Sequence, residues 1–261
     1  MDLHLDGDVA LVTASSSGLG FASARSLARE GAHVAVCGRD PERLAAAEAT
    51  LEGVGSGRVL VQEADLTDPA AVGALVEATV DEFGGLDHLV TSAAGPPPGG
   101  FHDMEDRDWY GAYDTLVMSA VWTVREAHPH LDDSEKGTWT AITSRSVREV
   151  IDDLVLSNAV RRAVVGVVKS VSHEFGPSVR ANAVLPGAHE TSRIEELVED
   201  AVERGEHDTY EDGLAEWGEG VPLDRIGDPQ ELGDVVAFLA SDRASYVNGT
   251  SLPIDGGSLR S

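Results

Sequence analysis

The sequence contains one cysteine, Cys37, and only two lysines, Lys136 and Lys169, among its 261 residues. A single cysteine excludes an internal disulfide and a cysteine-based metal site. Basic residues number 19 against 46 acidic ones, which gives a formal net charge of -27. Nucleic acid is therefore not an expected partner, because phosphate contacts need a basic surface.

The sequence also lacks any apolar run of the about 18 residues that a membrane-spanning helix needs. Its first residues, MDLHLDGDVALVTA, contain no basic segment followed by a long apolar stretch. We expect no membrane partner and a cytoplasmic location. Acidic residues occur in nearly every expected helix, and such an acidic surface repels itself unless salt screens it. We therefore hypothesise a halophilic protein from a cytosol of high salt.

No metal site is predicted, because the histidines do not have the spacing of metal ligands on one helix. We interpret them as surface residues or as buried residues with hydrogen-bond partners. They include His102, His128, His130, His173 and His189.

Apolar strand-like runs alternate with segments of helical period along the whole chain. This pattern predicts a parallel sheet covered by helices, and we expect one doubly wound α/β (Rossmann) domain over residues 1–261. The expected strands are Val9–Thr13, His33–Gly38, Arg58–Gln62, Asp87–Ser92, Thr138–Ser144, Arg180–Leu185 and Ser251–Ile254. The expected helices are Gly18–Glu30, one opening at Asp40-Pro41, one at Asp68-Pro69, Trp109–Leu131, Leu156–Phe175 and Gln230–Ala240.

The segment 190–221 is acidic, helical in pattern and poor in apolar residues. A segment of this kind is more typical of an excursion over a site than of a core. We interpret it as a lid.

A serine- and glycine-rich turn, Thr13-Ala14-Ser15-Ser16-Ser17-Gly18-Leu19-Gly20, lies between the first expected strand and the first expected helix. Backbone N–H groups and the helix dipole at such a turn bind a pyrophosphate. The turn predicts a dinucleotide site, with contacts from Thr13, Ser15, Ser16, Ser17, Gly18, Leu19 and Gly20.

The end of the second expected strand indicates which dinucleotide binds. An NAD site places an acid there to bind the ribose hydroxyls, and this chain has Gly38 followed by Arg39. The guanidinium of Arg39 suits a ribose 2′-phosphate, so NADP is favoured over NAD. Asp40, the next residue, is an acid and would favour NAD, although we interpret it mainly as a helix cap.

Together with later motifs, the turn resembles the short-chain dehydrogenase/reductase family, in particular its 3-oxoacyl-thioester reductases. Those motifs are Ala64-Asp65-Leu66, Thr91-Ser92-Ala93-Ala94-Gly95, Pro186-Gly187 with Thr191, Asn248-Gly249-Thr250 and Asp255-Gly256-Gly257. The turn departs from the family pattern only in Ala14, which replaces a glycine. The resemblance implies cofactor contacts from Asp65, Leu66, Ser92, Ala93, Pro186, Gly187 and Thr191, and a homotetramer or dimer.

The catalytic pattern departs further from the family. Ser144 matches the family's serine, but Ser157 stands where tyrosine is usual, Arg161 where lysine is usual and Leu116 where asparagine is usual. Serine is a far weaker acid than tyrosine, and arginine stays charged and cannot shuttle a proton. The resemblance thus implies an atypical site of Ser144, Ser157 and Arg161, with Arg161 also contacting the cofactor. His189 is the best substitute proton donor.

Three functions stay open. The first is an NADP(H)-dependent oxidoreductase that interconverts carbonyl and hydroxyl groups of a small or acyl substrate. The second is a non-catalytic NADP(H)-binding or sensing protein, and the third is a lyase or dehalogenase-like enzyme without hydride transfer. The lid favours an enzyme.

Four arginines near the expected site, Arg145, Arg148, Arg161 and Arg162, admit two readings. They suit an anionic substrate such as an acyl thioester or a phosphate, or they pair with Glu149, Asp152 and Asp153.

Overall fold

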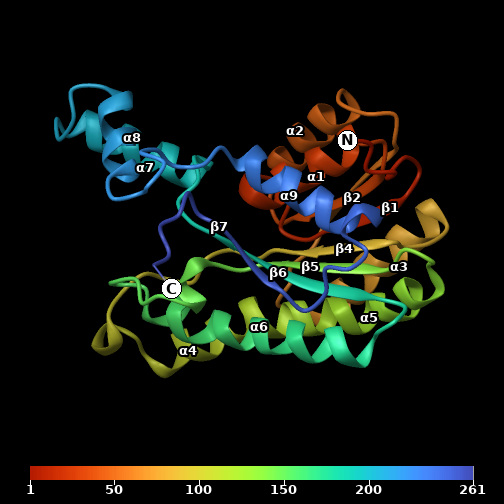
Figure 1. Ribbon diagram of the computed structural model, residues 1–261. Coiled ribbons are helices and arrows are strands. Elements are labelled where there is room, and N and C mark those ends of the chain that lie inside the picture. Colours follow the sequence, from red (N-terminus) through yellow and green to blue (C-terminus); the bar gives the residue numbers. More distant parts are fainter. Residues whose placement is uncertain (261) are drawn as a thin grey trace.

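One parallel sheet runs through the molecule, with its strands in the order β3-β2-β1-β4-β5-β6-β7 (Figure 1). The structure is a computed structural model that describes residues 1–260, apart from the side chains of residues 193, 196 and 200. The order reverses between β1 and β4, and open α/β sheets bind ligands outside the carboxyl ends of their strands at such a point. The strands are β1 (Val9–Val12), β2 (His33–Gly38), β3 (Val59–Glu63), β4 (His88–Thr91), β5 (Thr138–Ile142), β6 (Arg180–Pro186) and β7 (Ser251–Ile254).

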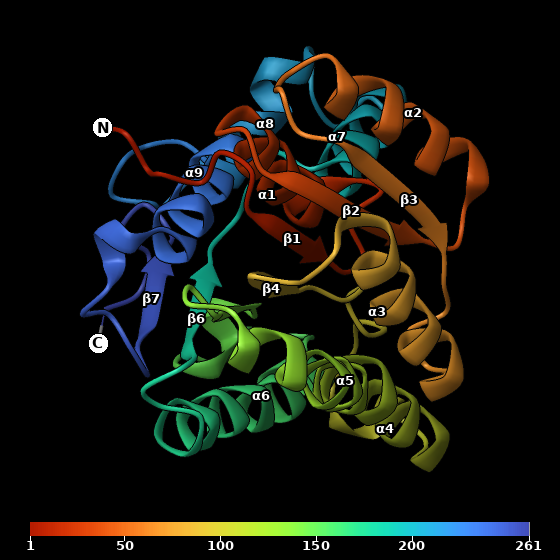
Figure 2. The ribbon, with the colours of Figure 1, turned by 90° about the vertical axis from the view of Figure 1, so that its right-hand side faces the viewer.

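Helices cover both faces of this sheet, as the alternating pattern predicts. Figures 1 and 2 show α1, α2 and α9 on one face and α3, α5 and α6 on the other. The central strands β1, β4 and β5 are buried along their whole length, and β1 consists only of valine, alanine and leucine, as expected of a covered parallel sheet. The helices are α1 (Gly18–Arg29), α2 (Pro41–Glu52), α3 (Pro69–Phe83), α4 (Asp106–Tyr113), α5 (Ser119–Asp133), α6 (Val155–Glu174), α7 (Ser192–Glu203), α8 (Tyr210–Gly218) and α9 (Pro229–Ala240).

The prediction of a single helix over Trp109–Leu131 is wrong in one respect. The structure divides it into α4 and α5, which are joined by a π-helical turn, η2 (Asp114–Met118). A π-turn inserts one residue into an otherwise helical repeat, and the apolar period of the sequence does not reveal the insertion. Leu116 and Val117 of this turn are buried.

The fifth strand is also shorter than predicted, since it ends at Ile142 rather than Ser144. The chain turns there into a 3-10 helix, η3 (Arg145–Val147), whose first turn is capped by the Ser144 side chain. Ser144 Oγ accepts a hydrogen bond of 3.1 Å from the N–H of Ser146.

Aspartates cap three of the helices, α2, α3 and α9. Asp40 accepts hydrogen bonds from the N–H groups of Glu42 and Arg43, which agrees with its interpretation as a cap. Asp68 and Asp228 cap α3 and α9 in the same way. Helix α1 differs, because Ser17 makes no side-chain cap and no acidic residue lies in the first turn. The N–H groups at that end are therefore left for another acceptor.

The predicted lid segment contains α7 and α8 and extends beyond the layered body at the carboxyl ends of the strands (Figure 1). The hydroxyl of Tyr210 on α8 donates a 2.9 Å hydrogen bond to Oε1 of Glu190 at the base of the segment. None of the helices formed by the described residues is long and apolar enough to cross a membrane.

Candidate functional site

A cavity of about 950 Å³ lies along the carboxyl ends of the central strands, from the serine- and glycine-rich turn to Arg161. Most of the residues predicted to contact the cofactor line it. These are Ser16, Ser17, Gly18, Leu19, Gly20, Arg39, Asp65, Leu66, Ser92, Ala93, Arg161 and Thr191.

The turn fits a phosphate. The first residues of α1, which have no side-chain cap, line the cavity, and a helix N-terminus of this kind attracts anions. Gly20 allows the turn to pack closely, because a Cβ at this position would lie 2.5 Å from the carbonyl oxygen of Ala14. Gly18 has a φ of +61°, and a Cβ there would lie 3.8 Å from Thr191 at the start of the lid. These features suit the pyrophosphate of a dinucleotide.

Two predicted contact residues, Thr13 and Ser15, lie behind the lining and hold the turn in place. Thr13 Oγ1 donates to the carbonyl of Ser92 at 2.8 Å and accepts from the N–H of Ser92 at 2.9 Å. Ser15 Oγ donates to the Val12 carbonyl at 2.6 Å and accepts from the Cys37 N–H at 3.1 Å. Both side chains thus tie the turn to neighbouring strands.

Pro186 and Gly187 also lie outside the lining. Pro186 ends β6, and Gly187 permits a close approach, because a Cβ there would lie 2.9 Å from the Cα of Asp255. His189 is buried, and its Nδ1 lies 3.2 Å from the carbonyl oxygen of Gly187. Burial lowers the pKa of His189. The structure therefore does not bring this histidine to the cavity.

The surroundings of Gly38 and Arg39 explain the missing acid at the end of β2. A Cβ on Gly38 would lie 2.7 Å from Oγ of Ser16, so a longer side chain there would displace the turn. Arg39 lines the cavity, and so does Arg43 from the first turn of α2, which the sequence reasoning missed. The position of Arg43, three residues after the Asp40 cap, is the feature of the sequence that could have indicated this contact.

Asp65 stands near these arginines on the rim of the cavity. Its Oδ1 accepts hydrogen bonds from the N–H and the hydroxyl of Thr67, at 2.9 and 2.8 Å. The bond from the Thr67 N–H is the main cause that lowers the pKa of Asp65. The carboxylate is therefore ionised at neutral pH.

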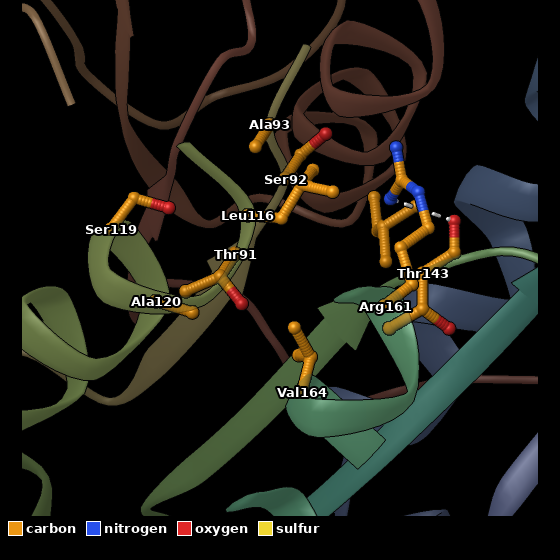
Figure 3. A pocket seen from close by; sticks show the side chains of 10 residues that line it. Thr91, Ser92, Ala93, Leu116, Ser119, Ala120, Thr143, Arg161 and Val164 are labelled. Atoms are coloured by element: carbon orange, nitrogen blue, oxygen red, sulfur yellow. Dashed lines mark hydrogen bonds between the residues drawn. The ribbon is translucent and has the colours of Figure 1, made fainter. Parts of the chain in front are cut away.

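Arg161 lies at the inner end of the cavity, on α6. Its Nη1 donates a 3.2 Å hydrogen bond to the carbonyl oxygen of Thr143, and its Nε is buried without a partner. Burial lowers the pKa of Arg161 to about 10, which still leaves the guanidinium charged at neutral pH. Arg161 also borders a small pocket of about 10 Å³, enough for one water-sized molecule. Figure 3 shows Thr91 and Ser119 across this pocket from Arg161.

The two serines predicted to be catalytic do not line the cavity. Ser144 is the cap of η3, and the hydroxyl of Ser157 lies 3.1 Å from that of Ser146. Leu116, at the position of the family's asparagine, lines the small pocket. Across residues 1–260, no tyrosine is among the residues that line the large cavity.

Of the four arginines near the site, only Arg161 lines the cavity. Arg145 lies 3.9 Å from Oε2 of Glu149, which agrees with the acid-pairing interpretation. Arg148 donates to the carbonyl of Ser251 at 2.8 Å, and Arg162 to that of Asn158 at 3.0 Å.

Comparison with known proteins identifies relatives over nearly the whole chain. The enoyl-(acyl carrier protein) reductase family model matches residues 13–258. Oxidoreductase UcpA of Escherichia coli K12 is 34% identical over 258 residues, covering 97% of this chain and 95% of the relative. Dehydrogenase/reductase SDR family member 4 of Bos taurus is 33% identical over 262 residues, covering 98% and 88%.

Solved structures agree with these relatives. L-sorbose reductase of Gluconobacter frateurii, in complex with NADPH and L-sorbose, has a TM-score of 0.95 at 29% identity and covers 100% of both chains. An NADPH-bound short-chain oxidoreductase of Pseudomonas aeruginosa PAO1 with an atypical catalytic center has a TM-score of 0.89 at 29% identity, covering 97% of each chain.

Proposed function

Because the chain belongs to the short-chain dehydrogenase/reductase family, we propose that it is an NADP(H)-dependent oxidoreductase that interconverts a carbonyl and a hydroxyl group. The observation that carries this proposal is the cavity, which joins an uncapped helix N-terminus at one end to the charged Arg161 at the other. Relatives named as oxidoreductases and neighbours crystallised with NADPH support it.

The residues present fit NADP. The turn from Ser16 to Gly20 would hold the pyrophosphate, and Arg39 with Arg43 would hold the ribose 2′-phosphate. Asp65 and Leu66 would border the adenine, and Ser92, Ala93 and Thr191 would shape the opposite end. Pro186 and Gly187 would support that end from outside the lining. When bound, the cofactor supplies or accepts a hydride.

Arg161 would stabilise negative charge on the substrate oxygen or bind the cofactor ribose, since a buried guanidinium acts strongly on nearby charge. Ser144 lies outside the cavity lining, next to the lining residue Thr143, and would hydrogen-bond the substrate carbonyl if its side chain left the cap of η3. Ser157 would act through its contact with Ser146, as a positioning residue.

The substrate would be a small molecule or an acyl thioester, as in the 3-oxoacyl reductases that the sequence resembles. By the same resemblance we propose a homotetramer or dimer.

The test is a screen in potassium chloride of high concentration. NADPH and NADH binding would be measured by fluorescence, and turnover by NADPH oxidation with carbonyl compounds and NADP⁺ reduction with alcohols. We expect NADPH to bind more tightly than NADH and at least one substrate class to turn over. Ser144→Ala should lower that turnover, whereas Ser170→Ala, an exposed serine of the same helix as Arg161, should not.

The absence of a tyrosine from the described cavity lining favours a second candidate, a non-catalytic NADP(H)-binding protein. Tight NADPH binding without turnover of any carbonyl or hydroxyl compound would support that candidate over the enzyme. A lyase or dehalogenase-like reaction through Arg161 and the serines predicts turnover that leaves the cofactor unchanged.

A further inference from the structure

Arg161 is unusual in this chain because its side chain is partly buried and its guanidinium makes few hydrogen bonds within the protein. One hydrogen bond, to the carbonyl oxygen of Thr143, accounts for one of its five N–H groups, and Nε has no partner. Burial alone accounts for its lowered pKa. In the part of the chain that the structure describes, no carboxylate pairs with it.

Arg180 shows how the same chain accommodates another partly buried arginine. Its Nη1 donates to the carbonyl of Val247, and its Nη2 lies 2.8 to 3.3 Å from three carbonyl oxygens at the end of α9. The carbonyl oxygens of Leu239, Ala240 and Ser241 are these three acceptors. Arg180 is thus satisfied by the fold, and Arg161 is not.

The position of Arg161 gives its free N–H groups access to a ligand. It forms the inner wall of the large cavity together with Ser92, Ala93, Ile142 and Thr143, none of which is charged. The acids that line the cavity, Asp40, Asp65 and Asp108, belong to other elements and do not pair with Arg161. A partly buried cation without a counterion is less well solvated than one in water, and an anionic ligand would compensate for that loss.

We propose that Arg161 binds a carboxylate carried by the substrate, so that the substrate class is a short oxo acid, such as a 2-oxo acid, and the corresponding hydroxy acid. This inference rests on the proposed oxidoreductase function. A planar guanidinium matches the two oxygens of a carboxylate. A single cation suits a single negative charge, whereas a phosphate dianion would call for a second basic group. The other basic residue of the lining outside the Arg39 and Arg43 region, Arg107, is largely exposed.

An acyl thioester would not suit this position. The carbonyl groups of a thioester are neutral, so the charge of Arg161 would stay without a counterion. A bound carboxylate therefore explains both the missing ion pair and the place of Arg161 in the cavity lining.

Binding of a compound that the enzyme cannot reduce tests the proposal without turnover. Oxamate has the shape and charge of a 2-oxo acid, and its methyl ester is the neutral match. Calorimetric titration of each into the protein, with and without saturating NADP⁺ and at fixed ionic strength, gives the two affinities. We expect oxamate to bind about 10- to 100-fold more tightly than methyl oxamate, the range typical of a hydrogen-bonded charge pair.

Two arginines side by side on α6 provide a matched pair of variants. Arg161→Gln should abolish the preference for oxamate, and Arg161→Lys should retain part of it. Arg162→Gln removes the same charge from an exposed side chain outside the cavity and should leave the preference unchanged. Equal affinities for the two compounds in the unmodified protein would overturn the proposal, and so would an equal loss in Arg161→Gln and Arg162→Gln.

NADPH binding, measured separately by fluorescence, distinguishes failure of the proposed function from failure of the carboxylate site. Failure to bind NADPH would refute the proposed function, whereas the oxamate titration without cofactor would still report on the carboxylate site. Normal NADPH binding with no preference for oxamate would refute only the carboxylate.

Discussion

The hydroxyl oxygens of Ser146 and Ser157 lie 3.1 Å apart, and both residues are buried. The resemblance to the family predicts a tyrosine at the position of Ser157, yet the hydroxyl of Ser157 bonds within the protein and does not line the cavity. The sequence position of Ser157 therefore does not give this residue the chemical role of a tyrosine.

Replacing Ser157 should therefore affect stability more than activity. We expect Ser157→Ala to cost about 1 kcal/mol of unfolding free energy, the worth of one buried hydrogen bond, and to lower kcat by less than about threefold, a change of well under 1 kcal/mol in the barrier. Urea denaturation and steady-state kinetics would measure the two effects. Ser146→Ala and the double variant would complete a cycle in which the two stability losses are not additive. A large loss of kcat at unchanged stability would instead show that Ser157 acts on the substrate.

Arg39 should determine the preference for NADPH. Arg39→Gln removes a cation from the expected 2′-phosphate position, so the Kd for NADPH should rise about 10-fold or more while that for NADH changes little. Fluorescence titration with both cofactors measures the difference. Arg29→Gln, at the other end of α1 where Arg29 pairs with Asp234, is the control. If Arg39→Gln weakened both cofactors equally, Arg39 would not read the phosphate.

Ala14 has a φ of +46°, in the left-handed region that favours glycine. Ala14→Gly should therefore raise the unfolding free energy by about 0.5–1 kcal/mol, the relief of strain less the added freedom of the unfolded chain. Chemical denaturation measures this change. The same substitution at Ala45, an exposed position of α2, should lower the unfolding free energy by about 1 kcal/mol. A loss at both positions would mean that Ala14 is not strained.

Asp8 makes hydrogen bonds with the buried His88 and with the half-exposed Lys136 at the amino-terminal edge of the sheet. Burial acts to raise the pKa of Asp8, but hydrogen bonds with His88 and Lys136 outweigh it and leave the pKa below its usual value. A carboxyl group whose pKa falls on folding stabilises the fold above its unfolded pKa, and this stabilisation is lost as the pH falls through the folded pKa.

Asp8→Asn should accordingly cost about 1.5–3 kcal/mol at pH 7, the worth of a hydrogen bond to a charged group. The cost should shrink below about pH 4, where the unfolded aspartate is protonated. Denaturation at both pH values measures it, with the exposed Asp132→Asn as the control. A cost independent of pH would indicate that packing rather than charge is responsible.

Salt should stabilise the protein strongly, because the chain carries a formal charge of -27. Raising KCl from about 0.1 M to about 1 M shortens the screening length from about 10 Å to about 3 Å and weakens the repulsion among carboxylates. We expect Tm to rise across this range, and more than in sucrose of matched osmolality. A Tm independent of KCl would refute the halophilic hypothesis.

The sequence predicts the fold well because strand and helix periods alternate without interruption and because turn residues mark the phosphate loop. It does not reveal η2, since one inserted residue leaves the apolar pattern of α4 and α5 intact. Side-chain direction escapes it as well. Nothing in the order of residues shows that Ser157 faces Ser146 or that Arg161 lacks a carboxylate, because both depend on contacts between η3, α6 and β5.

The uncapped start of α1 has a thermodynamic consequence. Aspartate side chains supply an acceptor at the starts of α2, α3 and α9, whereas α1 has no such side-chain acceptor and a bound anion would supply one. A ligand that binds only the folded state stabilises it by mass action, by about 2.7 kcal/mol at a concentration of 100 times its Kd. The concentration of cofactor would then set the resistance of the chain to unfolding and proteolysis, in addition to the rate of turnover.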